Sequence, residues 1–331
     1  QQVVDLAAEP FHLDGHEISI GASAGISICK PGCGCTDVDQ ILREADLALY
    51  NVKAEGRGSY QYFKESMNVR LLERKGLESD LRRAIHEDEF RVFYQPQVDA
   101  ASRKLVGVEA LVRWEHPKRG LVGPAEFIDV AEETGFIREI GQFVLETACS
   151  DLASWNDIKL AVNLSPVQFR KQGITKIISD TLAATQFDPQ RLELEITESV
   201  LLMEDAETDA ILVSLKNMGI SIAMDDFGTG YSSLSYLRKF PFDKLKIDRN
   251  FIADMGHDAD SNAIVQAVIR LAKSLGMRLN AEGVETHLQA DILHLEGCDE
   301  LQGYFFGKPM PLADLKEWAN KPREEKAISA C

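Results

Sequence analysis

The chain has 331 residues, of which 45% are hydrophobic and 27% are charged, and its formal net charge is −17. This composition is typical of a folded globular protein and excludes a wholly disordered chain. The negative charge makes double-stranded nucleic acid and anionic lipid surfaces poor partners, because global repulsion opposes their binding.

Targeting signals are not evident in the sequence. No apolar run approaches the roughly 18 residues that span a bilayer. The chain begins Gln1-Gln2-Val3, with no basic segment followed by an apolar one. The sequence is therefore compatible with an upstream sensory or membrane domain in a longer parent protein.

Six cysteines are present, and Cys33 and Cys35 are spaced as if for a metal site. No second pair follows at zinc-site spacing, so a turn in a reduced protein is the better interpretation. We therefore expect a cytoplasmic protein, or the cytoplasmic part of a membrane-anchored one.

The first segment predicts strands over residues 16–20, 23–28 and 59–63, with a helix over 37–54. About 60 residues of such mixed elements make a poor core on their own. Residues 64–89 carry apolar positions among many charges and no proline, which predicts an amphipathic connecting helix.

From residue 90 onward, apolar strands alternate with helical patterns. This alternation predicts a closed, TIM-like (β/α)8 barrel. An open doubly wound sheet is the alternative, although no GxGxxG motif opens a helix. Only residues 99–104 join the first two strands, so one barrel strand should be antiparallel. The predicted strands cover 92–94, 105–114, 160–164, 192–197, 220–224, 244–247, 279–281 and 301–306. Helical patterns lie between most of them, for example over 124–155, 206–218, 262–275 and 286–295.

Polar side chains recur where these strands end, which is where a barrel of this kind carries its catalytic groups. Carboxylates that converge on one mouth cannot all stay ionised without cations, since unpaired buried charge is very costly. The residues at these ends are Glu109, Arg113, Asn163, Glu195, Asp225, Asp226, Lys246, Asp248, Glu282 and Gln302.

Two divalent ions and Lys246 would balance the five carboxylates Glu109, Glu195, Asp225, Asp226 and Glu282, with Arg113 available to offset Asp248. Oxygen ligands with one Asn amide and no thiolate suit Mg²⁺ or Mn²⁺. Two such ions about 3.5–4 Å apart form the usual clamp for phosphodiester hydrolysis.

Strand alternation adds detail to this site. Glu109, Leu111 and Arg113 share one face, which puts Arg113 roughly 7 Å beyond the metal ligand, in reach of a substrate phosphate. Asp225 and Asp226 are adjacent and cannot both face inward from a regular strand. One must be re-aimed where the strand ends, before the flexible glycines 228 and 230.

Each residue also has a simpler structural interpretation. The Asp225-Asp226 pair alone is weak support for a metal, and an isolated Lys246 is more often solvated. Glu198 and Glu285 could cap loops, although we expect both to support the ligands that precede them. The prediction therefore depends on all the strand ends together.

These motifs resemble the EAL family of cyclic di-GMP phosphodiesterases over residues 90–318. The family's naming triplet is Glu109-Ala110-Leu111. The other matching segments are Tyr94-Gln95-Pro96, Glu132-Glu133-Thr134-Gly135, the run from Asp225-Asp226-Phe227-Gly228 to Leu234, and Gln302-Gly303-Tyr304.

The resemblance implies a barrel with one antiparallel strand, two Mg²⁺ or Mn²⁺ ions, inhibition by Ca²⁺, and a homodimer. It implies Lys246 at the attacking water with Gln302 beside it, substrate contacts from Gln95, Leu111 and Arg113, and Glu198 bracing the loop that begins at Asp225. The metal ligands that it implies are Glu109, Asn163, Glu195, Asp225, Asp226 and Glu282, with Asp248 contributing.

The N-terminal segment resembles the C-terminal part of a GGDEF diguanylate cyclase domain, on the run from Ala45 to Gly58. The GGDEF signature loop is absent, so we expect no cyclase activity. The expected organisation is a GGDEF fragment over 1–63, a connecting helix over 64–89, the EAL barrel over 90–321 and a tail over 322–331.

The expected activity is metal-dependent hydrolysis of cyclic di-GMP to linear pGpG, with Glu109, Glu282 and Lys246 as catalytic residues. Glu282 or Lys246 would assist proton transfer, and the sequence does not assign the general base. A non-catalytic cyclic di-GMP receptor is one alternative. A metallo-phosphodiesterase for another cyclic nucleotide is a second.

Overall fold

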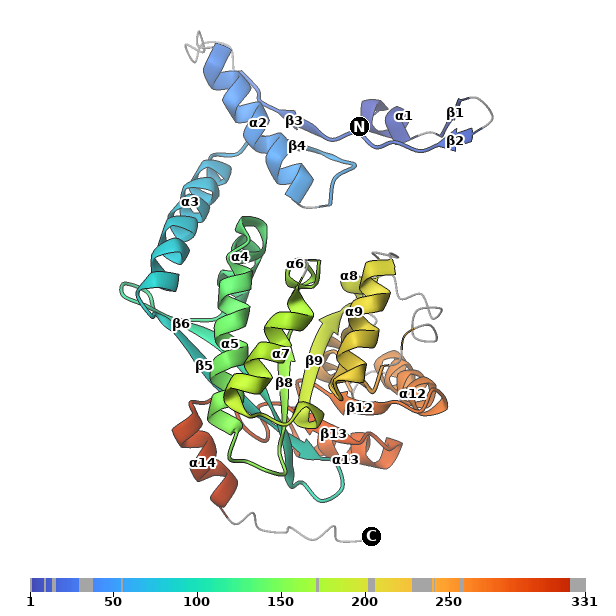
Figure 1. Ribbon diagram of the computed structural model, residues 1–331. Helices are drawn as coiled ribbons and strands as arrows, with labels where there is room; N and C mark the ends of the chain where they lie inside the picture. The colour runs from blue at the N-terminus through green and yellow to red at the C-terminus, as the bar shows by residue number, and fades with distance from the viewer. Residues whose placement is uncertain are drawn as a thin grey trace. The chain divides into compact units, whose positions relative to one another are not determined.

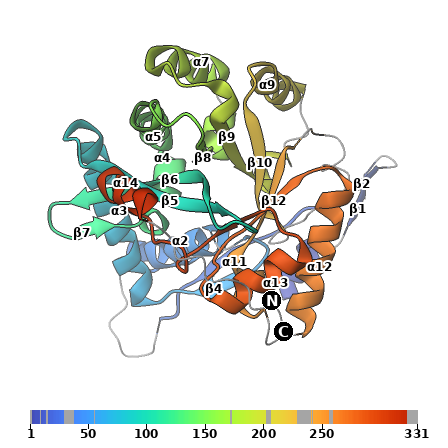
Figure 2. The same ribbon diagram turned by 90° about the horizontal axis from the view of Figure 1, so that it is seen from below.

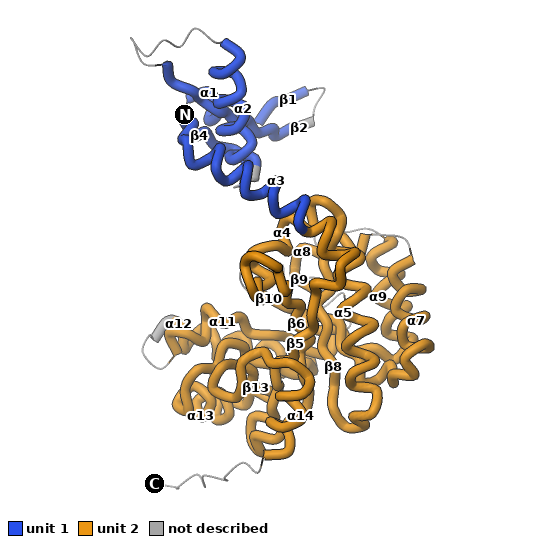
Figure 3. Tube along the Cα trace, turned by 90° about the vertical axis from the view of Figure 1, so that its left-hand side faces the viewer, with its two compact units in different colours: residues 1–80 blue, residues 81–331 orange. Residues whose placement is uncertain are grey.

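A computed structural model of the protein describes residues 2–8, 10–13, 16–29, 38–54, 56–170, 173–201, 206–227, 240, 242–255 and 259–321 (Figure 1). The chain divides into two compact units, residues 1–80 and residues 81–331 (Figure 3). The division falls within helix α3 (Glu65–His86). No helix among the described residues is both long and apolar enough to cross a membrane.

The first unit contains two small sheets and the long helix α2. Strands β1 and β2 pair antiparallel, whereas β3 and β4 pair parallel beside α2. A Cβ on Gly25 of β3 would lie 2.0 Å from the Ala45 carbonyl of α2, so only glycine permits this close approach. The elements are α1 (Gln2–Ala8), β1 (Phe11–Leu13), β2 (His16–Ile18), β3 (Ala24–Ile26), α2 (Val38–Ala54) and β4 (Tyr60–Tyr62).

The second unit is a closed eight-stranded barrel, which confirms the predicted fold class. Strands run in the order β5-β13-β12-β11-β10-β9-β8-β6, and pairing of β5 with β6 closes the ring. Strand β5 is antiparallel to both neighbours, as its short connection to β6 predicts. The strands are β5 (Phe90–Asp99), β6 (Leu105–His116), β8 (Lys159–Asn163), β9 (Leu192–Thr197), β10 (Ser221–Phe227), β11 (Lys244–Ile247), β12 (Arg278–Ala281) and β13 (Glu300–Gln302).

Helices surround this ring, and Figure 2 shows α5, α7, α9 and α12 outside the strands. The apolar residues of the strands, such as Leu160, Leu194 and Leu245, are fully buried and alternate with polar ones. The principal helices are α5 (Ile137–Leu152), α7 (Ile174–Thr185), α9 (Ala206–Asn217), α12 (Ala259–Ser274), α13 (His287–Glu296) and α14 (Leu312–Asn320). Shorter elements are β7 (Gly120–Val122), η1 (Pro124–Glu126), α4 (Ile128–Thr134), α6 (Pro166–Phe169), η2 (Pro189–Arg191), α8 (Glu198–Leu201) and α11 (Arg249–Ala253).

Three sequence predictions were wrong in extent. The strand expected over 92–94 covers ten residues, Phe90–Asp99. The helix expected over 124–155 is three pieces, because Gly135 adopts a left-handed φ of 82° and ends α4. The strand expected over 301–306 ends at Gln302, since the chain turns at Gly303, where a Cβ would lie 2.1 Å from the Val284 carbonyl. Helices α1 and α14 and strands β1 and β7 were not predicted.

Polar side chains fill the barrel lumen in layers. In an eight-stranded barrel each layer comes from alternate strands. Strands β6, β9, β11 and β13 alternate around this ring. They contribute Glu109, Glu195, Lys246 and Gln302 to one layer and, two residues earlier along each strand, Gly107, Glu193, Lys244 and Glu300 to the layer below.

Small residues make room for these long polar chains. Ala161 of β8 and Ala223 of β10 lie in register with the glutamates of β9 and are nearly fully buried. A Cβ on Gly107 would lie 2.8 Å from Gln97 Oε1. The lumen therefore has no large apolar filling at these positions, and hydrogen bonds and ion pairs decide where its side chains sit.

Glu89 ties the end of α3 to the barrel. Its carboxylate accepts from Arg83 Nε at 3.1 Å and from Trp114 Nε1 at 2.8 Å. The bond from Arg83, opposed in part by burial, lowers the pKa of Glu89.

We predict that Glu89→Gln lowers the free energy of unfolding by about 1–2 kcal/mol at pH 7, because it removes a charge-assisted acceptor. A lowered folded-state pKa stabilises the protein above the unfolded value of about 4.3, and this stabilisation disappears as pH falls through the folded value. The difference between parent and variant should therefore shrink below pH 4 in urea unfolding. An equal difference at pH 7 and pH 3 would contradict this assignment.

Candidate functional site

Three predicted carboxylates meet around the buried Lys246. Lys246 Nζ lies 2.6 Å from Glu195 Oε2 and 2.6 Å from Glu282 Oε1. Asp225 Oδ1 lies 3.2 Å from the same nitrogen. Both Lys246 and Glu195 are almost completely buried. We call Lys246, Glu195, Asp225 and Glu282 the Lys246 cluster.

A second group centres on Glu109, at the naming triplet. Its Oε1 accepts from Asn163 Nδ2 at 2.6 Å, and its Oε2 accepts from Gln302 Nε2 at 2.5 Å. Gln302 also donates to Gln95 Oε1 at 3.1 Å. The structure thus joins four of the predicted residues in one amide–carboxylate network beside the Lys246 cluster.

The charge of the Lys246 cluster is unbalanced. Burial alone would lower the pKa of Lys246, but the surrounding carboxylates, led by Asp225 and Glu109, raise it well above its ordinary value. Burial raises the pKa of Glu195 well above its usual range, only partly opposed by Lys246. Burial likewise raises the pKa of Glu282. Lys246 therefore stays protonated. Because carboxylates outnumber ammonium groups in the cluster, the site favours the binding of additional cations.

The backbone turns irregular at the second of the two adjacent aspartates, as the sequence predicts. Strand β10 loses regular register with β11 between Met224 and Phe227. Asp226 adopts a left-handed φ of 54°, uncommon for a residue other than glycine. Its pKa is raised, first by burial and then by Asp225 and Asp248. The glycines expected to form the following turn lie outside the described residues.

Arg113 lies at the far end of the face that carries Glu109. Its guanidinium stands 5.8 Å from the Phe93 ring centroid, and its NH1 donates to the Val112 carbonyl at 2.8 Å. Burial lowers the pKa of Arg113, while Tyr304 and Glu109 oppose that effect. Leu111 is half-buried between Glu109 and Arg113. No carboxylate within the described residues pairs with this guanidinium.

Three further predicted residues lie at the edge of this site. Asp248 is buried and caps α11, where its Oδ1 accepts from Asn250 N at 2.9 Å. Glu198 begins α8, and the loop it was expected to brace lies outside the described residues. Glu285 is exposed, with its backbone N–H donating to Gln289 Oε1. The supporting roles of Glu198 and Glu285 stay predictions.

The donor set suits a hard divalent ion. Its atoms are carboxylate and amide oxygens, which Mg²⁺ and Mn²⁺ prefer. Glu195 Oε1 is buried and accepts no hydrogen bond from the described residues. Among those residues, no three acidic, His or Cys side chains are already spaced as a closed metal site. Instead of a metal ion, the Lys246 ammonium pairs with the carboxylates of Glu195, Asp225 and Glu282.

Sequence analysis missed a second ionic layer. Lys244 Nζ lies 2.5 Å from Glu193 Oε1 and 2.6 Å from Glu300 Oε2. Arg278 NH2 lies 2.7 Å from Glu300 Oε1. The available signal was polar residues two apart in otherwise apolar strands, as in Glu193/Glu195 and Lys244/Lys246, because such pairs share a strand face.

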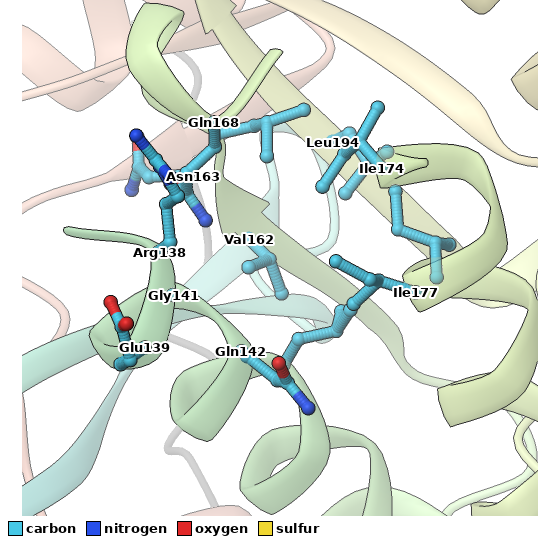
Figure 4. Close-up of a pocket in the computed structure, with 13 residues that line it drawn as sticks. Arg138, Glu139, Gly141, Gln142, Val162, Asn163, Gln168, Ile174, Ile177 and Leu194 are labelled. Carbon is cyan, nitrogen blue, oxygen red and sulfur yellow. The ribbon is translucent and has the colours of Figure 1, made fainter. Parts of the chain in front are cut away.

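A cavity of about 120 Å³ lies outside the barrel, between α5, α7 and the strands β8 and β9. Figure 4 shows Val162, Ile177 and Leu194 around it. Its walls are mainly apolar, and they include Asn163 but no carboxylate of the Lys246 cluster. The candidate chemistry therefore lies in the lumen and not in this cavity.

Comparison with known proteins is consistent with this geometry. The family model described as EAL domain matches residues 78–309. A protein of Pseudomonas aeruginosa named bifunctional diguanylate cyclase/cyclic di-GMP phosphodiesterase MucR is 41% identical over 95% of this chain and 46% of its own length. An uncharacterized signaling protein of Caulobacter vibrioides is 45% identical over 96% of this chain and 39% of its own length. The chain thus spans less than half of these relatives.

Solved structures show the same fold. The structure described as PaMucR phosphodiesterase, c-di-GMP complex, is 43% identical, with a TM-score of 0.70 over 72% of this chain and 99% of its own. The EAL enzyme Bd1971, in its cAMP and cyclic-di-GMP bound form, is 29% identical, with a TM-score of 0.74 over 86% of this chain and 77% of its own.

We predict that Lys246→Met lowers the free energy of unfolding by about 3–5 kcal/mol at pH 7, because it leaves buried carboxylates unpaired. Since burial raises the folded-state pKa of Glu195 and Glu282, folding then favours their protonated forms, and the loss should shrink as pH falls. Denaturant unfolding at pH 7 and pH 5 measures both effects. Lys176→Met, which breaks an exposed pair with Asp180, should change stability by less than about 1 kcal/mol. A Lys246→Met protein as stable as the parent would show that this lysine does not neutralise the cluster.

Proposed function

This chain belongs to the EAL domain family, and we propose from that premise that it hydrolyses one phosphodiester bond of cyclic di-GMP to give linear pGpG. The observation that carries the proposal is the meeting of Glu195, Asp225 and Glu282 around Lys246 inside the barrel, with the Glu109 network beside them. The substrate named for the similar MucR proteins fits a site with an amide network and an arginine beside it.

The oxygen ligands would hold two Mg²⁺ or Mn²⁺ ions. Glu195 Oε1 accepts no hydrogen bond from the residues that the structure describes, and carboxylates outnumber lysine in the cluster; both features favour such ions. When bound, divalent ions lower the pKa of water and offset charge on a phosphate. The ligands we assign are Glu109, Asn163, Glu195, Asp225, Asp226, Asp248 and Glu282.

The chain's own residues orient the reactants. Lys246, fixed by three carboxylates, would hold the attacking water for in-line attack on phosphorus. Glu282 is the most exposed carboxylate of the cluster, and we assign proton transfer to it, while Lys246 stays protonated. Arg113 would bind a phosphate oxygen, because it has a planar fork of donors and no carboxylate partner in the described structure.

The amide network would set the substrate's position. Gln302 donates to both Glu109 and Gln95, so one side chain links the expected ligand with the expected substrate contact. Leu111 supplies apolar surface between Glu109 and Arg113. The network thereby couples substrate position to the orientation of the Glu109 carboxylate.

Assembly and context follow the same family premise. We assign the barrel to residues 90–321, the connecting helix to 64–89 and a GGDEF fragment without cyclase activity to 1–63. The barrel would form a homodimer, with Ca²⁺ as an inhibitor in place of the smaller ions. An upstream sensory domain fits relatives that are more than twice as long as this chain, and we assign a cytoplasmic location on the family premise alone.

The first test is to incubate the chain with cyclic di-GMP and Mg²⁺ or Mn²⁺ and to separate the products by chromatography. We expect pGpG, and a loss of at least about 100-fold in kcat for Glu109→Gln, which removes a ligand charge. Glu115→Gln is the matched control, because Glu115 lies on the same strand but is exposed and pairs with Arg91. Tight binding without turnover in either metal would favour a receptor, and turnover of another cyclic nucleotide instead would favour the other metallo-phosphodiesterase.

A second test measures the metal without activity. We expect millimolar Mn²⁺ to raise the melting temperature of the parent, because an ion that binds only the folded state stabilises it. Glu195→Gln should abolish most of this rise, whereas Glu115→Gln, which changes an exposed carboxylate paired with Arg91, should retain it. An equal rise in all three proteins would place the bound ion elsewhere.

A further inference from the structure

Beneath the candidate site lies a buried ionic layer with no part in the proposed chemistry. Lys244 contacts Glu193 and Glu300, and all three side chains are no more than 2% exposed. Arg278, which is 45% exposed, pairs with the other oxygen of Glu300. Two cations thus face two carboxylates. We call these four residues the Lys244 cluster.

The contacts of this cluster cross the barrel. Lys244 is on β11, Glu193 is on β9 and Glu300 is on β13, so each bond passes over an intervening strand. The cluster therefore joins three alternate strands directly, in addition to the backbone ladder between neighbours.

The same three strands carry three members of the site, each two residues further on. Lys246 follows Lys244, Glu195 follows Glu193, and Gln302 follows Glu300. Residues two apart on a strand share a face and lie about 6.6–7 Å apart. The strand stagger that brings Lys244, Glu193 and Glu300 together therefore also sets the positions of Lys246, Glu195 and Gln302 along the barrel axis.

Stability alone is a weak reason for burying these charges. The cost of taking ions out of water commonly offsets their attraction, so an uncharged layer of similar volume is often equally stable. Directional, charge-assisted bonds instead fix geometry. The Lys244 cluster is also balanced in charge, so its influence on the site should be through position.

We propose that the Lys244 cluster is a register clamp that positions Lys246, Glu195 and Gln302 for the reaction. Lys244, Glu193 and Glu300 are positioning residues and do not touch the substrate. The inference rests on the proposed function, because it assigns the clamp to the catalytic geometry of that site.

The test replaces the buried charges together by Lys244→Met, Glu193→Gln and Glu300→Gln, which keeps side-chain volumes and leaves no unpaired buried ion. We expect a folded protein whose kcat is lower by at least about tenfold, since small misplacements of reacting groups are costly. KM should change by less than about threefold, because Gln95, Arg113 and the metal ligands remain. In its crystal structure, Lys246 should lose at least one of its three carboxylate contacts.

Two further variants keep the test decisive. Glu300→Gln alone retains the Lys244–Glu193 pair, and it should fold and show a smaller loss in kcat even if the triple variant does not fold. Lys216→Met breaks a partly exposed Lys–Asp pair outside the lumen and should leave kcat within about twofold of the parent.

A folded triple variant with the parent's kcat and all three Lys246 contacts would overturn the clamp. If the triple variant does not fold, Glu300→Gln with the parent's kcat and Lys246 contacts would overturn it. Failure of the parent to hydrolyse cyclic di-GMP would instead refute the proposed function. The Lys246 contacts in the variant crystal structures would then still decide whether the lower layer positions the upper one.

Discussion

Every charge in the barrel lumen needs a partner, because water cannot compensate for one that is left alone. Lys246 and Lys244 are each no more than 1% exposed, and each is surrounded by carboxylates from other strands. The two lysines therefore determine which strands must approach one another inside the ring. The arrangement of the remaining polar residues follows from these two centres.

An apolar shell around the strands stabilises a barrel whose lumen is polar. The outward faces of the strands carry Leu160, Leu194 and Leu245, which are buried against the helices. Hydrophobic stabilisation is thus supplied outside the strand ring, whereas most barrels of this type also fill the inside with branched apolar side chains. The small inward residues Gly107, Ala161 and Ala223 leave the space that long polar chains occupy.

The two ionic layers differ in one respect that matters for function. The lower layer is balanced, because Arg278 joins Lys244 against two carboxylates. The upper layer has more carboxylates than cations, and the raised pKa of Glu195 reflects that excess together with burial. A balanced layer can hold a structure, while an unbalanced one favours the binding of positive ions. The candidate ligand site thus lies directly above a layer whose charges are balanced.

The sequence by itself determined the barrel, its antiparallel first strand and the list of strand-end residues, because alternation, connection length and motif order are local properties. It also predicted that Asp225 or Asp226 must be re-aimed where the strand ends, since adjacent residues of a regular strand cannot both face inward. Only the tertiary structure decided that Lys246 takes Glu195 and Glu282 as partners, that Glu109 bonds Gln302, and that Lys244 joins Glu193 to Glu300. These pairings join residues that are at least 36 positions apart in the chain, as Lys246 and Glu282 are, and up to 193 apart. They depend on strand stagger around a closed ring, which no local pattern of residues encodes.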